Sequence, residues 1–202
     1  MTAEQLYSHI KAIYNAEDEI LCDLHRPCEN ARKCHNTLKH PVINFDEIKK
    51  EFHAGVVGDT PASVDGITYT GNRFCFVEVK GWVEFLAHLK ARDKAAAIKK
   101  QAASYDLNKK LFNSIDICQD LSGISQLLLE MPVTFVLVTD IETESDGLEM
   151  FHSNLLRLSE STDTWTECCS KELKSRLDTI PGNIPTVYVS CKGFDEKMSL
   201  LA

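Results

Sequence analysis

The sequence predicts an α/β domain in which a mixed central sheet is flanked by helices. Two segments rich in β-branched and aromatic residues, Ile67–Thr70 and Arg73–Val79, surround a Gly71-Asn72 break and so predict a β-hairpin. Further along, Val133–Asp140 is a nearly continuous apolar run, which is typical of a central strand buried on both faces. A stretch without Pro or Gly separates the hairpin from this run and predicts a long helix.

The other elements follow from periodicity, capping residues and breaks. Asn44 is suited to be an N-cap, since Glu47 stands three residues after it. The final strand is predicted over Thr186–Cys191, and residues 141–166 are acidic and predict a surface excursion. The predicted helices are 3–16, Phe45–His53, Trp82–Leu89 as a short helix or turn, Asp93–Asp120, Leu155–Leu158 and Thr166–Ile180.

Length and composition predict one domain. The chain has 202 residues, of which 44% are hydrophobic and 26% charged. We divide it into a helical, Cys/His-rich part at 1–42 and a core at 43–202. The first twenty residues are amphipathic and acidic, unlike a signal peptide, and no apolar run reaches the roughly 18 residues of a membrane span. We therefore expect a soluble, cytoplasmic protein without a membrane partner.

The hairpin carries the residues best suited to chemistry. Side chains alternate along a strand, so Glu78 and Lys80 share one face, roughly 7 Å apart. Asp65, at the start of the preceding strand, supplies a second acid. The face of Glu78 also carries Phe74 and Phe76, and the opposite face carries Cys75, Val77 and Val79.

Two carboxylates and a lysine suit phosphoryl chemistry. Mg²⁺ and Mn²⁺ prefer oxygen ligands and commonly use one or two carboxylates together with phosphate oxygens, a role that Asp65 and Glu78 could fill. Lys80 could orient an attacking water or offset charge on the phosphorane. The alternative is a solvated charge pair on an exposed strand. The apolar character of the strand favours a site, because Glu and Lys are rarely buried unless they are paired or functional.

The same residues resemble a known family. Asp65, twelve further residues and Glu78-Val79-Lys80 resemble the motif of the PD-(D/E)xK nuclease superfamily, with Val64 where the family name has proline. Gln101 and Tyr105 resemble the QxxxY signature of its RecB-like branch.

The resemblance implies a restriction-endonuclease-like αβββαβ core, of which one early strand is not evident in the sequence. It also implies that the two acids bind Mg²⁺ or Mn²⁺, that Lys80 assists the water, and that Gln101 and Tyr105 support the site. The family often places another acid on the preceding helix. Glu51 or Glu47 is the candidate, and an ordinary exposed helix glutamate is the alternative for each.

Charge is unevenly distributed. The whole chain carries a net charge of −8, yet the segment from Lys80 to Phe112 has eight basic residues and three acidic ones. A basic strip beside the predicted metal site suits a phosphate backbone, although lysines on a helix can also be its solvated face. We expect nucleic acid as the partner, DNA rather than RNA. Cutting both strands at once would require a second copy, so a homodimer stays open.

Eight cysteines allow another interpretation. Cys22, Cys28 and Cys34 lie close to several histidines, a density that could indicate a zinc or iron–sulfur site. Their spacing lacks the short Cys-x₂₋₄-Cys pair of structural zinc sites, so we favour ordinary buried thiols. Three functions follow: a metal-dependent nuclease, a noncatalytic nuclease-fold module that binds nucleic acid or protein, and a metal- or redox-sensing interaction protein built on these cysteines.

Overall fold

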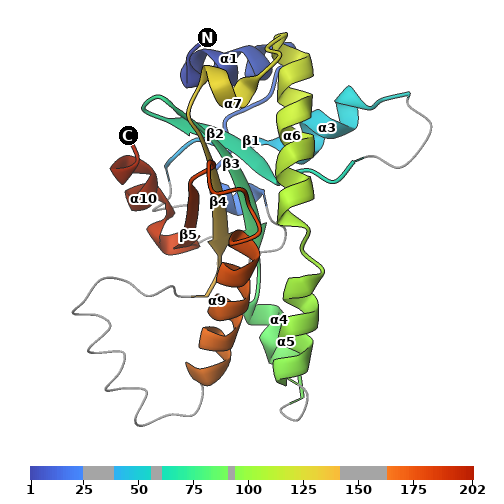
Figure 1. The fold of residues 1–202 in the computed structure, drawn as a ribbon, viewed down its shortest axis with the longest axis vertical. Coiled ribbons are helices and arrows are strands. Elements are labelled where there is room, and N and C mark those ends of the chain that lie inside the picture. The colour runs from blue at the N-terminus through green and yellow to red at the C-terminus, as the bar shows by residue number, and fades with distance from the viewer. Residues whose placement is uncertain (25–38, 56–60, 91–93, 142–162) are drawn as a thin grey trace.

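The computed structural model describes residues 1–24, 39–55, 61–90, 94–141 and 163–202. In these residues five strands form one mixed sheet in the order β1-β2-β3-β4-β5, with helices on both faces (Figure 1). The strands are β1 (Ile43–Asn44), β2 (Gly66–Thr70), β3 (Arg73–Lys80), β4 (Val133–Thr139) and β5 (Thr186–Ser190). The α-helices are α1 (Ala3–Ile13), α3 (Phe45–Phe52), α4 (Val83–His88), α5 (Lys94–Ala103), α6 (Leu107–Ser122), α7 (Leu127–Glu130), α9 (Asp163–Leu177) and α10 (Phe194–Leu200).

The predicted hairpin is confirmed. Strands β2 and β3 pair antiparallel, with Ile67 opposite Phe76, and the turn between them contains Gly71 at φ 53°. Glycine adopts this left-handed conformation without the steric cost that a Cβ atom adds. A Cβ atom at Gly71 would also lie 2.6 Å from the backbone oxygen of Ala202, so the close approach of the C-terminal residue imposes the same requirement.

The two faces of β3 belong to two separate parts of the core, as the alternation predicts. Phe74 and Phe76 pack in the larger part, which α1 and α6 cover. The opposite face of β3 packs under α10, against Phe194 and Met198. The residues of that opposite face are Cys75, Val77 and Val79.

A histidine, His40, lies between α10 and strand β2 at the edge of this part of the core. The ring of His40 lies against Phe194 with 5.7 Å between the ring centroids, and its Nε2 is 3.0 Å from Oγ1 of Thr68. The Thr68 hydroxyl donates to the carbonyl of Pro41, so Nε2 of His40 is the donor toward Thr68. Burial lowers the pKa of His40, against the opposing effect of the Asp195 carboxylate.

Strand β4 is central, as predicted. It pairs in parallel with β3 on one side and with β5 on the other. All seven of its residues are buried, with Phe135 and Leu137 in one part of the core and Val136 and Val138 in the other. A parallel pair needs a crossover connection, so residues 81–132 bring the chain back to the end of the sheet at which β3 begins, where β4 also begins.

Strand β1 was not predicted from the sequence and is only two residues long. It pairs antiparallel with β2 and leads directly into α3, where the Asn44 side chain accepts a hydrogen bond from the backbone N–H of Glu47 at 3.4 Å. The predicted helix and its N-cap are therefore confirmed. A two-residue strand gives too short an alternation pattern to be recognised in sequence.

The predicted single helix Asp93–Asp120 is wrong, because the chain forms α5 and α6 with a break at residues 104–106. Ser104 donates its hydroxyl to the carbonyl of Gln101, and Asp106 caps α6 by accepting the backbone N–H of Lys109 at 3.1 Å. Side chains that bond to the backbone compete with helical hydrogen bonds and favour such ends.

The ends of other predicted helices also shift. The first helix stops at Ile13, since Asn15 adopts a positive φ of 48°, and the last long helix begins earlier, at Asp163. The predicted helix Leu155–Leu158 and most of the excursion at 141–166 lie outside the described residues. No helix in the described part of the chain has the length and apolar character needed to cross a membrane.

Candidate active site

Four charged side chains meet where β3 ends. Lys80 forms an ion pair with Glu78 and lies 3.9 Å from Oδ2 of Asp65. Lys110, from α6, lies 2.6 Å from Oε1 of Glu78 and 3.7 Å from Oδ1 of Asp65. Each ammonium group thus contacts both carboxylates, and we call these four residues the charge cluster. The structure brings together the three residues of the predicted motif and adds Lys110.

Glu78 is the most deeply buried member of the cluster. Its side chain has no exposed surface, and Oε2 has no hydrogen-bond partner among the described residues. Burial raises the pKa of the Glu78 carboxyl and Asp65 adds to the increase, whereas Lys80 and Lys110 oppose it. A carboxylate is expensive to bury, and the two ammonium groups offset part of that cost.

Lys80 is held from two sides. Burial disfavours its charged form, but Glu78 and Asp65 outweigh burial and raise the pKa of the Lys80 ammonium. Its Nζ also lies 5.0 Å from the centre of the Tyr105 ring, within the range of a cation–π contact. The ammonium of Lys80 is therefore fixed between two carboxylates and an aromatic face.

Gln101 and Tyr105 lie beside this lysine. Nε2 of Gln101 donates to the Tyr105 hydroxyl at 3.2 Å, and the Tyr105 ring meets the buried indole of Trp82 edge to face. Tyr105 stands in the break between α5 and α6, not within a helix as predicted. Gln101 thus reaches the site through Tyr105, whose hydroxyl accepts its side-chain hydrogen bond.

The backbone fixes Asp65 within the cluster. Its Oδ2 accepts a hydrogen bond from the backbone N–H of Val79 at 2.7 Å, which joins the start of β2 to the end of β3. Two residues of α6 hold the segment just before Asp65: Ser114 accepts the backbone N–H of Val64 at 3.0 Å, and Asn113 donates to the carbonyl of Ala62 at 2.8 Å. These bonds set the position of α6, and hence of Lys110.

Helix α3 contributes Asp46 where the sequence suggested Glu51 or Glu47. The Asp46 carboxylate accepts from Ser63 at 3.0 Å, and its charge acts on Lys80. Glu51 is exposed, and its charge acts instead on Tyr14. Among the described residues, no ion pair or hydrogen bond joins Glu51 or Glu47 to the charge cluster. Helical periodicity places Asp46 on a different face from Glu51, and only packing against the sheet decides which face points inward.

Asp140 is a further residue that the sequence analysis did not select. It follows β4 and accepts the backbone N–H groups of Trp82 at 2.6 Å and of Val83 at 3.1 Å. An acidic residue at the carboxyl end of a parallel strand, in the run VTFVLVTD, was the available signal. Asp140 thus fixes the turn after β3. It thereby supports Trp82, whose ring packs against the Tyr105 ring beside Lys80.

The cysteine hypothesis falls mainly outside the described residues. Cys28 and Cys34 are not described, and Cys22 is buried in the part of the core under α10. Within the described residues no group of three or more His, Cys, Asp or Glu side chains is arranged to hold a metal ion. The carboxylates available at the charge cluster are therefore two, Asp65 and Glu78.

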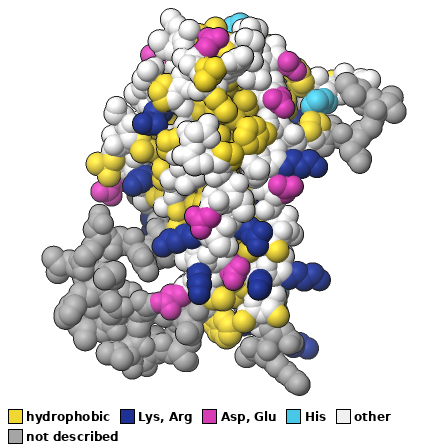
Figure 2. Space-filling view, in the orientation of Figure 1, with side chains coloured by type: hydrophobic (Ala, Val, Ile, Leu, Met, Phe, Trp, Pro, Cys, Tyr) yellow, Lys and Arg dark blue, Asp and Glu magenta, His cyan; other side chains and the backbone are white. Residues whose placement is uncertain are grey.

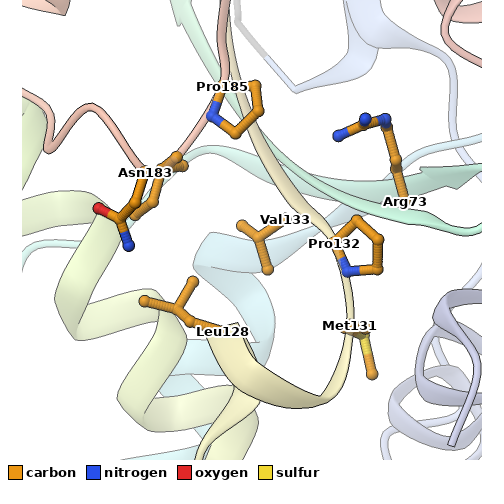
Figure 3. Close-up of a pocket in the computed structure, with 8 residues that line it drawn as sticks. Arg73, Leu128, Met131, Pro132, Val133, Asn183 and Pro185 are labelled. Carbon is orange, nitrogen blue, oxygen red and sulfur yellow. The ribbon is translucent and has the colours of Figure 1, made fainter.

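The opposite end of the sheet is chemically different. A cavity of about 200 Å³ opens where β3, β4 and β5 begin, and its one charged side chain is Arg73 (Figure 3). The guanidinium of Arg73 donates to the hydroxyl of Thr134 at 3.3 Å. The rest of the lining is apolar or amide: Leu128, Met131, Pro132, Val133, Asn183, Ile184 and Pro185. We find no paired acid and base there.

Surface charge also differs along the molecule. Figure 2 shows Lys and Arg side chains gathered over the lower half, where Figure 1 places α5 and α9, with acidic side chains among them. Lys99, Lys100 and Lys109 are exposed on α5 and α6. The upper half of the same view is more apolar.

Comparisons with known proteins do not add to this description. No protein-family model, curated protein or solved structure matches the chain.

Proposed function

We propose that this protein is a metal-dependent nuclease that hydrolyses phosphodiester bonds of nucleic acid, DNA rather than RNA. The observation that carries the proposal is the charge cluster: Asp65, Glu78 and Lys80 come together at the end of β3, with Glu78 fully buried. Buried ionisable groups with specific charge partners are more frequent at functional sites than elsewhere. The sequence motif that these residues resemble supports the same chemistry.

The fold we propose is restriction-endonuclease-like. The described elements include a helix, an antiparallel unit β1-β2-β3, a helical crossover and the parallel strand β4. This order agrees with an αβββαβ core, to which β5 and α10 are additions. Five strands in a mixed sheet are compatible with other α/β folds, so the proposal depends on the site as well as on topology.

The donor atoms at the cluster suit a hard divalent cation. Asp65 and Glu78 would hold Mg²⁺ or Mn²⁺, and the unpartnered Oε2 of Glu78 is an acceptor that such a cation would satisfy. When bound, the cation would supply positive charge against the scissile phosphate. Two protein carboxylates are sufficient, because Mg²⁺ commonly completes its coordination with water and substrate oxygens.

Lys80 would act on the attacking water. Its Nζ is fixed by Glu78, Asp65 and the Tyr105 ring, so it can donate a hydrogen bond in a constant direction. A positioned ammonium also offsets the negative charge that develops on the phosphorane. Gln101 would act through Tyr105, whose hydroxyl it holds, and we assign both to positioning Lys80.

The acidic net charge of the whole chain and the basic character of α5, which carries three lysines and no acidic residue, would favour binding of the phosphate backbone on one side only. Electrostatics of this kind supplies affinity without reading sequence. A homodimer would allow both strands of a duplex to be cut, since the chain offers one charge cluster within its described residues.

A noncatalytic nuclease-fold module is the second candidate. The observation that supports it is the balance of charge within the cluster. Two ammonium groups already neutralise the two carboxylates, as in a buried structural ion network. Such a network would give the fold its specificity without requiring a cation.

Hydrolysis assays separate the two candidates. Labelled single-stranded DNA, double-stranded DNA and RNA would be incubated with Mg²⁺, Mn²⁺ or EDTA, and wild type compared with Glu78→Gln and Lys80→Met. The nuclease proposal expects cleavage that requires a divalent cation and is lost in both variants, with circular dichroism unchanged. Absence of cleavage on all three substrates, together with absence of Mn²⁺ binding by calorimetry, would favour the noncatalytic module.

A further inference from the structure

Lys110 occupies a position that the proposed nuclease activity does not explain. Its Nζ contacts Oε1 of Glu78 at 2.6 Å and Oδ1 of Asp65 at 3.7 Å, the two side chains that would hold the divalent cation. Lys80 already provides one positive charge to the same carboxylates. A second ammonium group makes the cluster electrically neutral, so the attraction that it offers to a cation is reduced.

The position of Lys110 is built into the fold. Its carbonyl accepts the hydroxyl of Ser114, and that hydroxyl oxygen accepts the backbone N–H of Val64 next to Asp65. Asn113 adds a second bond from α6 to the same segment. The neighbouring Lys109 is exposed and lies outside the cluster, so the contact is not a general property of lysines on α6.

Lys110 is nevertheless the more accessible of the two lysines. Its side chain is 23% exposed, against 15% for Lys80, and Lys80 alone has the additional contact with the Tyr105 ring. A long side chain with one exposed side can turn outward without unfolding its helix. Lys110 can thus leave the carboxylates while Lys80 stays.

We propose that Lys110 is an internal counter-ion of Asp65 and Glu78, which a divalent cation must displace before the site becomes active. This inference depends on the proposed nuclease function and adds regulation of the same site. Without nucleic acid, Lys110 competes with the cation and keeps its affinity low. When a phosphate group binds, it gives the displaced ammonium a new partner outside the carboxylate pair, so cation and nucleic acid bind cooperatively.

Mn²⁺ affinity in the absence of nucleic acid tests the proposal. Calorimetry would compare wild type with Lys110→Gln, which removes the charge, Lys110→Arg, which keeps it, and Lys109→Gln as the matched control. Removing one positive charge within about 4 Å of the ligands should tighten Mn²⁺ binding by about tenfold or more. Lys110→Arg and Lys109→Gln should stay within about twofold of wild type. Equal or weaker binding by Lys110→Gln would overturn the inference.

Wild-type protein provides a second test, in which the charge of the cluster is left unaltered and a variant serves only to assign a resonance. With nitrogen-15 in the lysine side chains, the Lys110 ammonium resonance is assigned by its loss in Lys110→Arg. Saturating Mg²⁺ should shift that resonance and increase its exchange with water, while the Lys109 resonance stays unchanged. Saturation of the site without a change at Lys110 would overturn the counter-ion role alone. Absence of Mg²⁺ and Mn²⁺ binding in every form would overturn the proposed metal dependence together with this inference.

Discussion

The two faces of β3 bury polar groups in opposite ways. On the face under α6, the strand ends in Glu78 and Lys80, and burial of the Glu78 carboxylate is compensated by ammonium groups from two elements. On the face under α10, the buried polar side chains include Thr68 and Thr70, whose hydroxyls donate to backbone carbonyls, and burial lowers the pKa of the His40 ring beside Thr68.

The difference shows where charge is retained and where it is avoided. A neutral, hydrogen-bonded imidazole satisfies burial at little cost, so the contact between the His40 ring and Thr68 needs no ionised side chain. Replacing a buried ion network by apolar side chains is often neutral or stabilising in other proteins. The network under α6 therefore calls for a reason besides stability, and cation-dependent chemistry is the reason we propose.

The strongest test of this comparison is the loss of the buried carboxylate. Glu78→Gln keeps the shape but removes the charge, so we expect cleavage to fall about 10³-fold, the upper range for one electrostatic group at an active site. Glu130→Gln, an exposed residue on α7, is the control and should cleave like wild type. If Glu78→Gln retained cleavage activity, the buried carboxylate would not be needed for catalysis, and the face under α6 would have no functional role that the face under α10 lacks.

Stability provides the second test. Lys80→Met leaves the buried Glu78 with Lys110 as its one remaining ammonium, and we expect the free energy of unfolding to fall by about 3 kcal/mol. Lys109→Met removes an exposed charge and should change it by about 0.5 kcal/mol or less. Urea denaturation measures both. Similar losses in the two variants would mean that the cluster is solvated and not a buried network.

The pH dependence of stability tests the face under α10. Because the pKa of His40 is lowered from 6.5, the unfolded chain binds a proton more readily than the folded one as pH falls below that value. We expect the free energy of unfolding to decrease below pH 6.5, by at most about 1.4 kcal/mol per pH unit, until the folded pKa is reached. His40→Gln should lose this slope, and His9→Gln, an exposed control, should keep it. If the unfolding free energies of wild type and His40→Gln had the same dependence on pH, His40 would not be buried as a neutral imidazole.

The smallest effect concerns how α10 is attached to the sheet. Thr70 donates its buried hydroxyl to the carbonyl of Met198 at 2.7 Å, so Thr70→Val should cost about 1 kcal/mol of unfolding free energy without affecting cleavage. Ser199→Ala, whose hydroxyl is exposed on the same helix, should cost less. Thermal unfolding and the cleavage assay check both properties. Loss of cleavage in Thr70→Val would show that the two faces are coupled.

Sequence reasoning succeeded where local pattern decides structure. The alternation along β3 placed Phe76 and Val77 on the correct faces, and Asn44 identified the start of α3. It failed at the break before Asp106. No Gly or Pro marks the end of α5, and the residues on both sides of Asp106 are ones that helices commonly contain, so the sequence does not reveal that Asp106 caps a new helix.

The candidate site was predictable only in part. Asp65, Glu78 and Lys80 lie on one hairpin, so their meeting follows from local geometry. Lys110 and Asp46 arrive from helices whose rotation is set by packing, and no spacing in the sequence distinguishes Lys110 from Lys109. Tertiary contacts, not periodicity, decide which of two adjacent lysines is turned inward.

The members of the charge cluster are separated by very different lengths of chain, which bears on how the site is assembled during folding. A hairpin such as β2–β3 closes within microseconds, whereas β4 can join only after residues 81–132 have formed their crossover. We therefore expect Asp65, Glu78 and Lys80 to become neighbours before Lys110, which lies 32 residues after Glu78. Mn²⁺ added during refolding should then slow the step in which Lys110 reaches the two carboxylates, and a refolding rate unchanged by Mn²⁺ would contradict this order.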